Sequence, residues 1–121
     1  MMNPILVNFS NHPSAKWEKK QVEAAQQYGE IEDFPFPIVP PEMNAGDVRR
    51  LADKYAKQLL NLFSVEATVH IMGEMTFTFA VVTRLKEMGI RCVASTTERK
   101  TTYNADGTKV SEFSFVKFRE Y

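Results

Sequence analysis

The sequence predicts an α/β fold: a small Rossmann-like domain with a mostly parallel sheet, helices on both faces and a C-terminal β-hairpin. Two observations support this prediction. Apolar, strand-like runs alternate with helical patterns along most of the chain, and an Asp-Gly pair separates two β-rich segments near its end. The length of 121 residues suits one domain. We therefore expect residues 1–121 to fold as a single unit.

The first part of the chain is expected to contain a strand, a helix and a second strand. Residues 5–9 form an almost continuous apolar run, typical of a strand buried on both faces. Ser14 is placed to cap a helix that Gly29 would end. Residues 30–33 fit a short strand, and the prolines of residues 34–41 favour an extended loop, because proline fixes φ and lacks a donor.

The middle of the chain predicts a longer helix, a strand and another helix. Asn44 and Asp47 resemble a capping pair, and apolar residues then keep helical spacing as far as Phe63. Residues 65–72 are rich in strand-forming side chains, and residues 76–88 have a helical pattern. Parallel strands need such crossover helices, which is why a mostly parallel sheet is expected.

The last part of the chain predicts a strand followed by a hairpin. Residues 90–95 have an apolar centre and are expected to end in the polar segment 96–100. Asp106-Gly107 between residues 101–103 and 110–118 is a strong hairpin signal.

Composition excludes several classes of function. Fifteen basic and fifteen acidic side chains give no net charge, so no overall field draws the protein to DNA or to anionic membranes. Neither a signal peptide at the start nor an apolar run of about 18 residues is visible. Cys92 is the single cysteine, which favours a reducing compartment. We therefore expect a cytoplasmic protein with no membrane and no direct DNA partner.

Ligands of such folds bind outside the carboxyl ends of the strands, which selects four loops. The first contains Ser10, Asn11, His12 and Ser14 at the start of a predicted helix, where amide protons and the helix dipole favour an anion such as phosphate. The alternative is that Ser14 only caps the helix and His12 is a surface residue.

The second loop contains Gly73, Glu74 and Thr76, and glycine there would allow close approach to a second anion. The alternative is that Thr76 is only a helix cap. The third segment follows the last predicted parallel strand and combines hydroxyls with two cations suited to phosphate. The segment runs from Ser95 to Lys100, and its candidate residues are Thr96, Thr97, Arg99 and Lys100. The alternative for this segment is an ordinary strand with solvated charges.

Other residues carry weaker signals. Asp33 and the aromatic-proline run 34–37 could wall a pocket for a stacked base, although such runs more often pack against a core. His12 and His70 lie in no metal-binding spacing, so we expect neither a metal nor a cofactor. His70 is interpreted as a core or edge residue, and Cys92 as a buried, inert thiol.

The segment Asn11-His12-Pro13-Ser14-Ala15-Lys16-Trp17 after a first strand resembles the opening of small CRISPR-associated Rossmann-like proteins grouped with the ring nucleases, which are single-domain relatives of CARF sensors. The turn at Gly73-Glu74-Met75-Thr76, leading into an apolar helix, is similar to the second half of the same pattern. The resemblance covers about half of the chain.

This resemblance implies that a homodimer binds a cyclic oligoadenylate, most naturally cyclic tetra-adenylate, as part of type III CRISPR antiviral defence. It also implies cleavage without a metal, in which a ribose 2′-hydroxyl attacks the neighbouring phosphate. His12, Arg99 and Lys100 would then be the catalytic candidates. Two alternatives stay open: a non-catalytic protein that sequesters or senses the same nucleotide, and a structural dimer without a small ligand.

Overall fold

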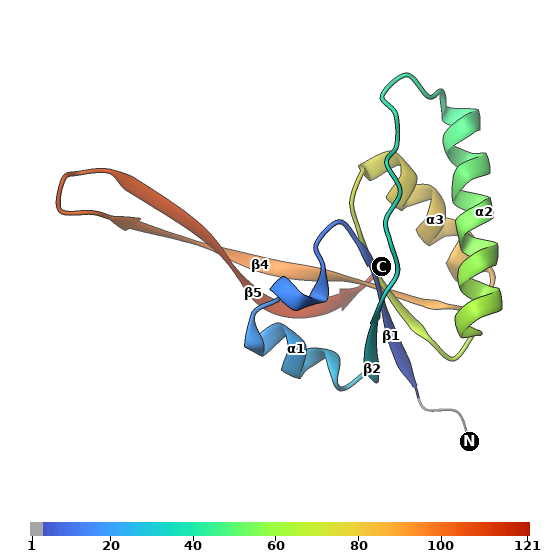
Figure 1. Ribbon diagram of the computed structural model, residues 1–121, viewed down its shortest axis with the longest axis horizontal. Helices are drawn as coiled ribbons and strands as arrows, with labels where there is room; N and C mark the ends of the chain where they lie inside the picture. The colour runs from blue at the N-terminus through green and yellow to red at the C-terminus, as the bar shows by residue number, and fades with distance from the viewer. Residues whose placement is uncertain (1–3) are drawn as a thin grey trace.

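The computed structural model describes residues 4–121 and shows three layers, with helices on both faces of one five-stranded sheet (Figure 1). The alternation of strands and helices expected from the sequence is therefore confirmed. In chain order the elements are β1 (Ile5–Ser10), a short 3-10 helix η1 (Ser14–Lys16), α1 (Lys19–Ala25), β2 (Glu30–Asp33), α2 (Ala45–Phe63), β3 (Thr68–Met72), α3 (Met75–Glu87), β4 (Arg91–Tyr103) and β5 (Lys109–Glu120).

The strand order across the sheet is β2-β1-β3-β4-β5. The first four strands are parallel, and β5 returns antiparallel to β4. The chain leaves β1 to one side to form β2 and then crosses to the other side to form β3. The direction of winding thus reverses between β1 and β3, which is where ligands bind in doubly wound sheets of this order.

Helices α2 and α3 cover one face of the sheet (Figure 1). The side chain of Asn44 accepts a hydrogen bond from the Asp47 amide at 3.0 Å, which confirms the predicted cap of α2. The loop between β2 and α2 places Phe34 and Phe36 against the core beside Phe9. These rings therefore pack the core and do not wall an open pocket for a stacked base.

Helix α1 covers the opposite face, where a second apolar cluster includes Trp17 and Phe118. The side chain of Glu18 accepts a hydrogen bond from the Phe115 amide at 2.9 Å, which links the start of α1 to the middle of β5. The sequence suggested that Ser14 caps this helix. It does not, because α1 begins only at Lys19, with Glu18 at the N-cap position.

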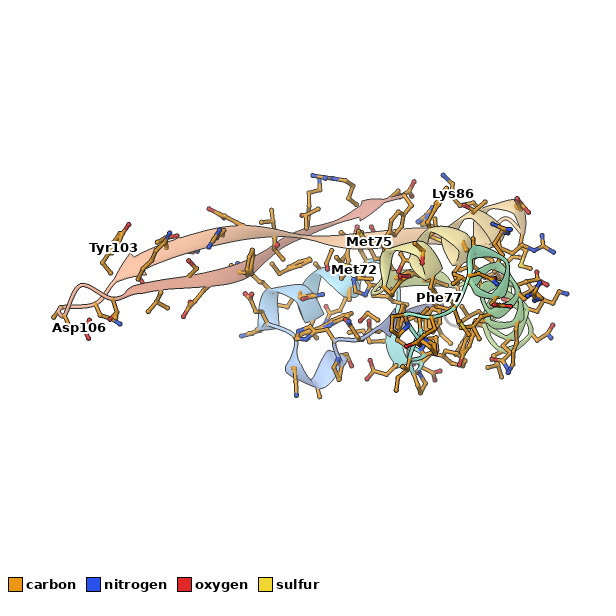
Figure 2. The ribbon with its side chains drawn as sticks, turned by 90° about the horizontal axis from the view of Figure 1, so that it is seen from above. Met72, Met75, Phe77, Lys86, Tyr103 and Asp106 are labelled. Atoms are coloured by element: carbon orange, nitrogen blue, oxygen red, sulfur yellow. The ribbon has the colours of Figure 1, made fainter. Side chains whose placement is uncertain are left out.

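Strands β4 and β5 continue beyond the rest of the sheet as a two-stranded arm, which Figures 1 and 2 show projecting from the body with Tyr103 and Asp106 near its tip. The predicted hairpin is confirmed, and Gly107 supplies the positive φ of 87° that its turn requires. The prediction that the strand ends at Ser95 was wrong. Residues 96–100 pair with β5 instead of forming a loop, and they join residues 101–103, which were expected in the hairpin, into one continuous strand.

Candidate functional site

The carboxyl ends of β1 and β3 meet at the point where the winding reverses. Ser10 and Met72 are register partners at this edge, and the Asn11 amide donates to the Met72 carbonyl at 3.4 Å. The loop that follows β1 and the loop that follows β3 therefore lie side by side. The general rule for parallel sheets predicted that both loops lie at one edge, and the strand order, which the sequence did not predict, makes them neighbours.

A chain of buried polar side chains lies on the α1 side of this edge. The imidazole Nδ1 of His70 is 2.9 Å from the side-chain oxygen of Asn8, and the Ser10 hydroxyl donates to the same oxygen at 2.7 Å. The Asn8 amide nitrogen donates to Asp33 at 2.8 Å. The other imidazole nitrogen, Nε2, lies 3.2 Å from the Ser95 hydroxyl. Four strands thus contribute to one connected network.

His70 is uncharged at neutral pH in this network. His70 is only 2% exposed, and its ring packs edge to face against the aromatic rings of Trp17 and Phe118. Burial, together with a smaller effect of the neighbouring His12, lowers the pKa of His70 to about 4. The ring therefore acts as one donor and one acceptor rather than as a cation.

The loop carrying His12 is held by its backbone. The His12 carbonyl accepts hydrogen bonds from the Asn8 side chain at 2.9 Å, the Trp17 indole at 3.1 Å and the Ser10 hydroxyl at 3.2 Å. The residue itself is exposed. This arrangement fixes the backbone of His12 beside the polar network, while the residue stays exposed to solvent.

Ser14 is hydrogen-bonded to the carboxylate of Asp33 in the same chain. Its amide and its hydroxyl donate to the two oxygens of Asp33 at 3.1 and 2.8 Å. Burial by itself would raise the pKa of Asp33, but the hydrogen bonds from Asn8 and Ser14 outweigh it and lower that pKa. The donors that the sequence offered to a phosphate are therefore already paired with Asp33.

Glu74, and not Thr76, is the N-cap of α3. The Glu74 carboxylate accepts hydrogen bonds from the Phe77 amide at 2.8 Å, from the Thr76 amide at 3.3 Å and from the Thr76 hydroxyl. The bond from the Thr76 hydroxyl is the largest cause of a lowered pKa at Glu74. Here too, the amides expected to bind an anion are paired with a carboxylate of the chain itself.

The third predicted segment lies on the arm, not in a loop. Thr96 donates its hydroxyl to the Lys117 carbonyl at 3.0 Å, and Thr97 is exposed one residue further along β4. Arg99 lies four residues beyond Ser95, or about 13 Å along an extended strand. Because side chains alternate, Arg99 shares a side of β4 with Ser95 and Thr97, whereas Lys100 lies on the other side.

Two hollows lie on the α3 side of the molecule. One, of about 550 Å³, adjoins the candidate site because Met72 and Gly73 line it together with Phe79 and Tyr121. The other, of about 790 Å³, lies between α2 and α3 and is remote from the polar network. Among residues 4–121, no three metal-binding side chains gather closely enough to hold an ion. No helix in this range is long and apolar enough to cross a membrane.

The sequence analysis missed Asn8 as a member of the site, named Ser95 only as the start of the segment that ends at Lys100, and interpreted His70 only as a core or edge residue. One signal was available. Asn8 and Ser10 alternate along an otherwise apolar strand, which places both side chains on one face of the sheet. The pairing of Asn8 with His70 required the strand register, which the sequence does not contain.

The strand order and the helices on both faces define a small doubly wound α/β protein. Its candidate ligand site lies at the switch point, the place between β1 and β3 where the direction of winding reverses. The chain belongs to the Uncharacterized protein MJ1673 family, whose model matches residues 4–119. No curated protein matches the chain.

Proposed function

We propose that this protein binds a cyclic oligoadenylate, most naturally cyclic tetra-adenylate, across a homodimer in the cytoplasm and cleaves it without a metal, as a ring nuclease of type III CRISPR defence. The observation that carries the proposal is the placement of His12. Its imidazole is exposed at the switch point, on a loop that three hydrogen bonds to the His12 carbonyl hold in place.

The resemblance in the segment from His12 to Trp17 supports the same proposal, because the two residues are in direct contact. The Trp17 indole nitrogen donates to the His12 carbonyl at 3.1 Å. A histidine followed five residues later by tryptophan therefore builds one rigid loop. In the proposed reaction, His12 accepts the proton of the attacking 2′-hydroxyl, which requires a base fixed within hydrogen-bond distance of it.

Other parts of the surface suit an adenylate ring. Thr97 and Arg99 continue from the site along one side of the arm, where a guanidinium would attract phosphate. The 550 Å³ hollow beside Gly73 offers the aromatic rings of Phe79 and Tyr121 to a planar base. The distance from Ser95 to Arg99 is about 13 Å, so a ligand that uses both ends must be larger than one nucleotide.

One observation favours the second candidate, a protein that sequesters or senses the nucleotide without cleaving it. The Ser14 donors and the first amides of α3 are paired with the carboxylates of Asp33 and Glu74. Few free donors then remain to stabilise the extra negative charge of a transition state, on which catalysis of this kind depends.

A homodimer follows from the symmetry of the ligand, because a symmetric ring is best matched by a two-fold site. Met75 and Phe79 are 83% and 64% exposed on α3 beside the candidate site, and such apolar side chains suit a contact between subunits. The absence of net charge also removes repulsion between copies. The single, buried cysteine fits the reducing environment of the cytoplasm.

The test is to incubate the protein with cyclic tetra-adenylate in the presence of EDTA and to separate the products by chromatography. A linear product ending in a 2′,3′-cyclic phosphate is expected. The matched control is the ring made of 2′-deoxyadenylate, which lacks the attacking hydroxyl and should bind but stay intact. Binding without turnover would favour the second candidate. Neither binding nor cleavage, with a monomer in sedimentation at micromolar concentration, would refute both.

A further inference from the structure

Ser95 has an unusual set of hydrogen-bond partners. The β3–β4 ladder ends at His70 and Val93, so the Ser95 amide lies beyond the last ladder pair. That amide points to the Met72 sulfur at 3.3 Å, and the Ser95 hydroxyl lies 2.9 Å from the same sulfur. A thioether is a weak acceptor, so it satisfies the Ser95 amide poorly, and the single hydroxyl hydrogen of Ser95 has a better acceptor in the His70 imidazole.

The proton positions around His70 follow from its neighbours. The Asn8 amide group uses both of its hydrogens, on the Asp33 carboxylate and on the His12 carbonyl, so the Asn8 oxygen faces His70 as an acceptor. His70 Nδ1 must then carry the proton. The lone pair of Nε2 faces the Ser95 hydroxyl at 3.2 Å and can take its proton.

This arrangement has the three parts of an activated nucleophile: a hydroxyl, a base in hydrogen-bond contact with it, and a group that orients the base. Ser95 supplies the hydroxyl, His70 the base, and Asn8 the orientation, with Asp33 holding Asn8. The Ser95 amide adds a donor beside the reacting oxygen, where an oxyanion would form. The Met72 sulfur occupies that position.

We propose that Ser95 is a nucleophile that attacks the carbonyl carbon of small, uncharged esters, with His70 as its general base and Asn8 and Asp33 as positioning residues. An uncharged substrate is favoured because Asp33 is the charged group of the network. Among residues 4–121, no lysine or arginine side chain forms a hydrogen bond or ion pair with Ser95, His70, Asn8 or Asp33. This activity is independent of the proposed nucleotide chemistry.

The reaction balances without a cofactor. The Ser95 oxygen bonds to the carbonyl carbon while its proton moves to His70 Nε2, and the carbonyl oxygen becomes an oxyanion near the Ser95 amide. The carbon–oxygen bond to the alcohol then breaks, and His70 returns the proton to the leaving alcohol. Water hydrolyses the acyl-serine by the same route and restores the free hydroxyl.

Met72 must move for an oxyanion to reach the Ser95 amide. Its side chain is flexible and 37% exposed, and it lies where the arm leaves the body (Figure 2), so such a movement needs no change in the sheet. Met72→Ala should therefore expose the nucleophile and leave the base in place.

The test uses a fluorophosphonate, which phosphorylates activated serines with loss of fluoride, followed by peptide mass spectrometry to locate the label. We expect the label on Ser95 in the parent protein, and several-fold faster labelling in Met72→Ala. His70→Gln should slow labelling at least about a hundredfold, as loss of a general base does. Ser111→Ala, which removes an exposed hydroxyl of the arm, is the matched control and should label at the parent rate.

A second measurement uses p-nitrophenyl acetate, whose yellow product should appear with a burst of up to one equivalent per Ser95. The proposal is overturned if Ser95 stays unlabelled in both the parent and Met72→Ala, or if label spreads equally over exposed serines. It is also overturned if folded His70→Gln, checked by circular dichroism, labels as fast as the parent. The site of labelling in the parent decides the question even if His70→Gln does not fold.

Discussion

The ring of Phe36 lies directly against the backbone of Gly73. A Cβ built on Gly73 would come within 2.3 Å of the Phe36 ring, closer than any real contact. Phe36 cannot easily move, because its ring packs against Phe9 and Phe77 with centroid distances of 5.2 and 5.3 Å. The glycine after β3 is therefore required by packing in the core, in addition to any approach of a ligand.

Gly73→Ala is expected to lower the free energy of unfolding by about 1 to 3 kcal/mol, as overpacking of a close-packed core does. Urea unfolding followed by circular dichroism measures this change. Gly46→Ala is the matched control: Gly46 lies in α2, and its new Cβ would meet the nearest atom at an ordinary 3.5 Å. That variant should gain up to about 1 kcal/mol, because alanine suits a helix better. Equal effects of the two variants would contradict this account of Gly73.

His12→Ala is expected to impair nucleotide handling far more than folding. The interactions that hold the loop involve the His12 carbonyl, which the substitution keeps, so the free energy of unfolding should change by less than about 0.5 kcal/mol. Cleavage of cyclic tetra-adenylate should fall by about 10² to 10⁴. Trp17→Phe is the structural comparison, because it removes one bond to that carbonyl and should cost about 1 kcal/mol. Unchanged turnover in His12→Ala would exclude this imidazole as the base.

Arg99→Ala is expected to weaken binding of cyclic tetra-adenylate by about ten- to a hundredfold, the effect of losing a charge-assisted hydrogen bond. Lys100→Ala should have a smaller effect, because Lys100 lies on the other side of β4, opposite Glu112. Calorimetric titrations at two salt concentrations would compare both variants with the parent. Binding should weaken as salt rises, with a shallower slope in Arg99→Ala. If affinities and slopes are identical in all three proteins, the arm takes no part in binding.

His70 is expected to make the protein sensitive to acid. Burial lowers its pKa from 6.5 to about 4, so between these values the unfolded chain binds a proton that the folded protein does not. Stability should therefore fall as the pH drops, by about 3 kcal/mol between pH 7 and pH 4, at 1.36 kcal/mol for each unit of pKa difference. His12 and Asp33 also lie close to this network, but both are present in the parent and in the variant, so the comparison of the two proteins removes their contributions. Urea unfolding of the parent and of His70→Gln across this range isolates the His70 contribution. Parallel pH profiles of the two proteins would contradict it.

Local patterns in the sequence determined most of the elements. The spacing of apolar residues predicted α2 and its Asn44 cap, and Asp106-Gly107 predicted the hairpin, because capping and turn geometry depend on residues only a few positions apart. The sequence also predicted which edge of the sheet to consider as a candidate site, since the carboxyl ends of parallel strands meet at one side of a sheet. Local patterns failed at two helix starts. Glu74 binds the first amides of α3, where Thr76 was the expected cap, and α1 begins only after Glu18, whose carboxylate accepts from Phe115 of β5.

The tertiary structure alone decided which side chains work together. Asn8, His70 and Ser95 come from three strands, and their contacts depend on a register that pairs Asn8 with His70 and places Ser95 beyond the last pair of the β3–β4 ladder. Register is a property of how strands pack, and no residue carries it by itself. The placement of Arg99 on an arm was decided in the same way, because pairing with β5 extended β4 past the point where its own apolar pattern ends.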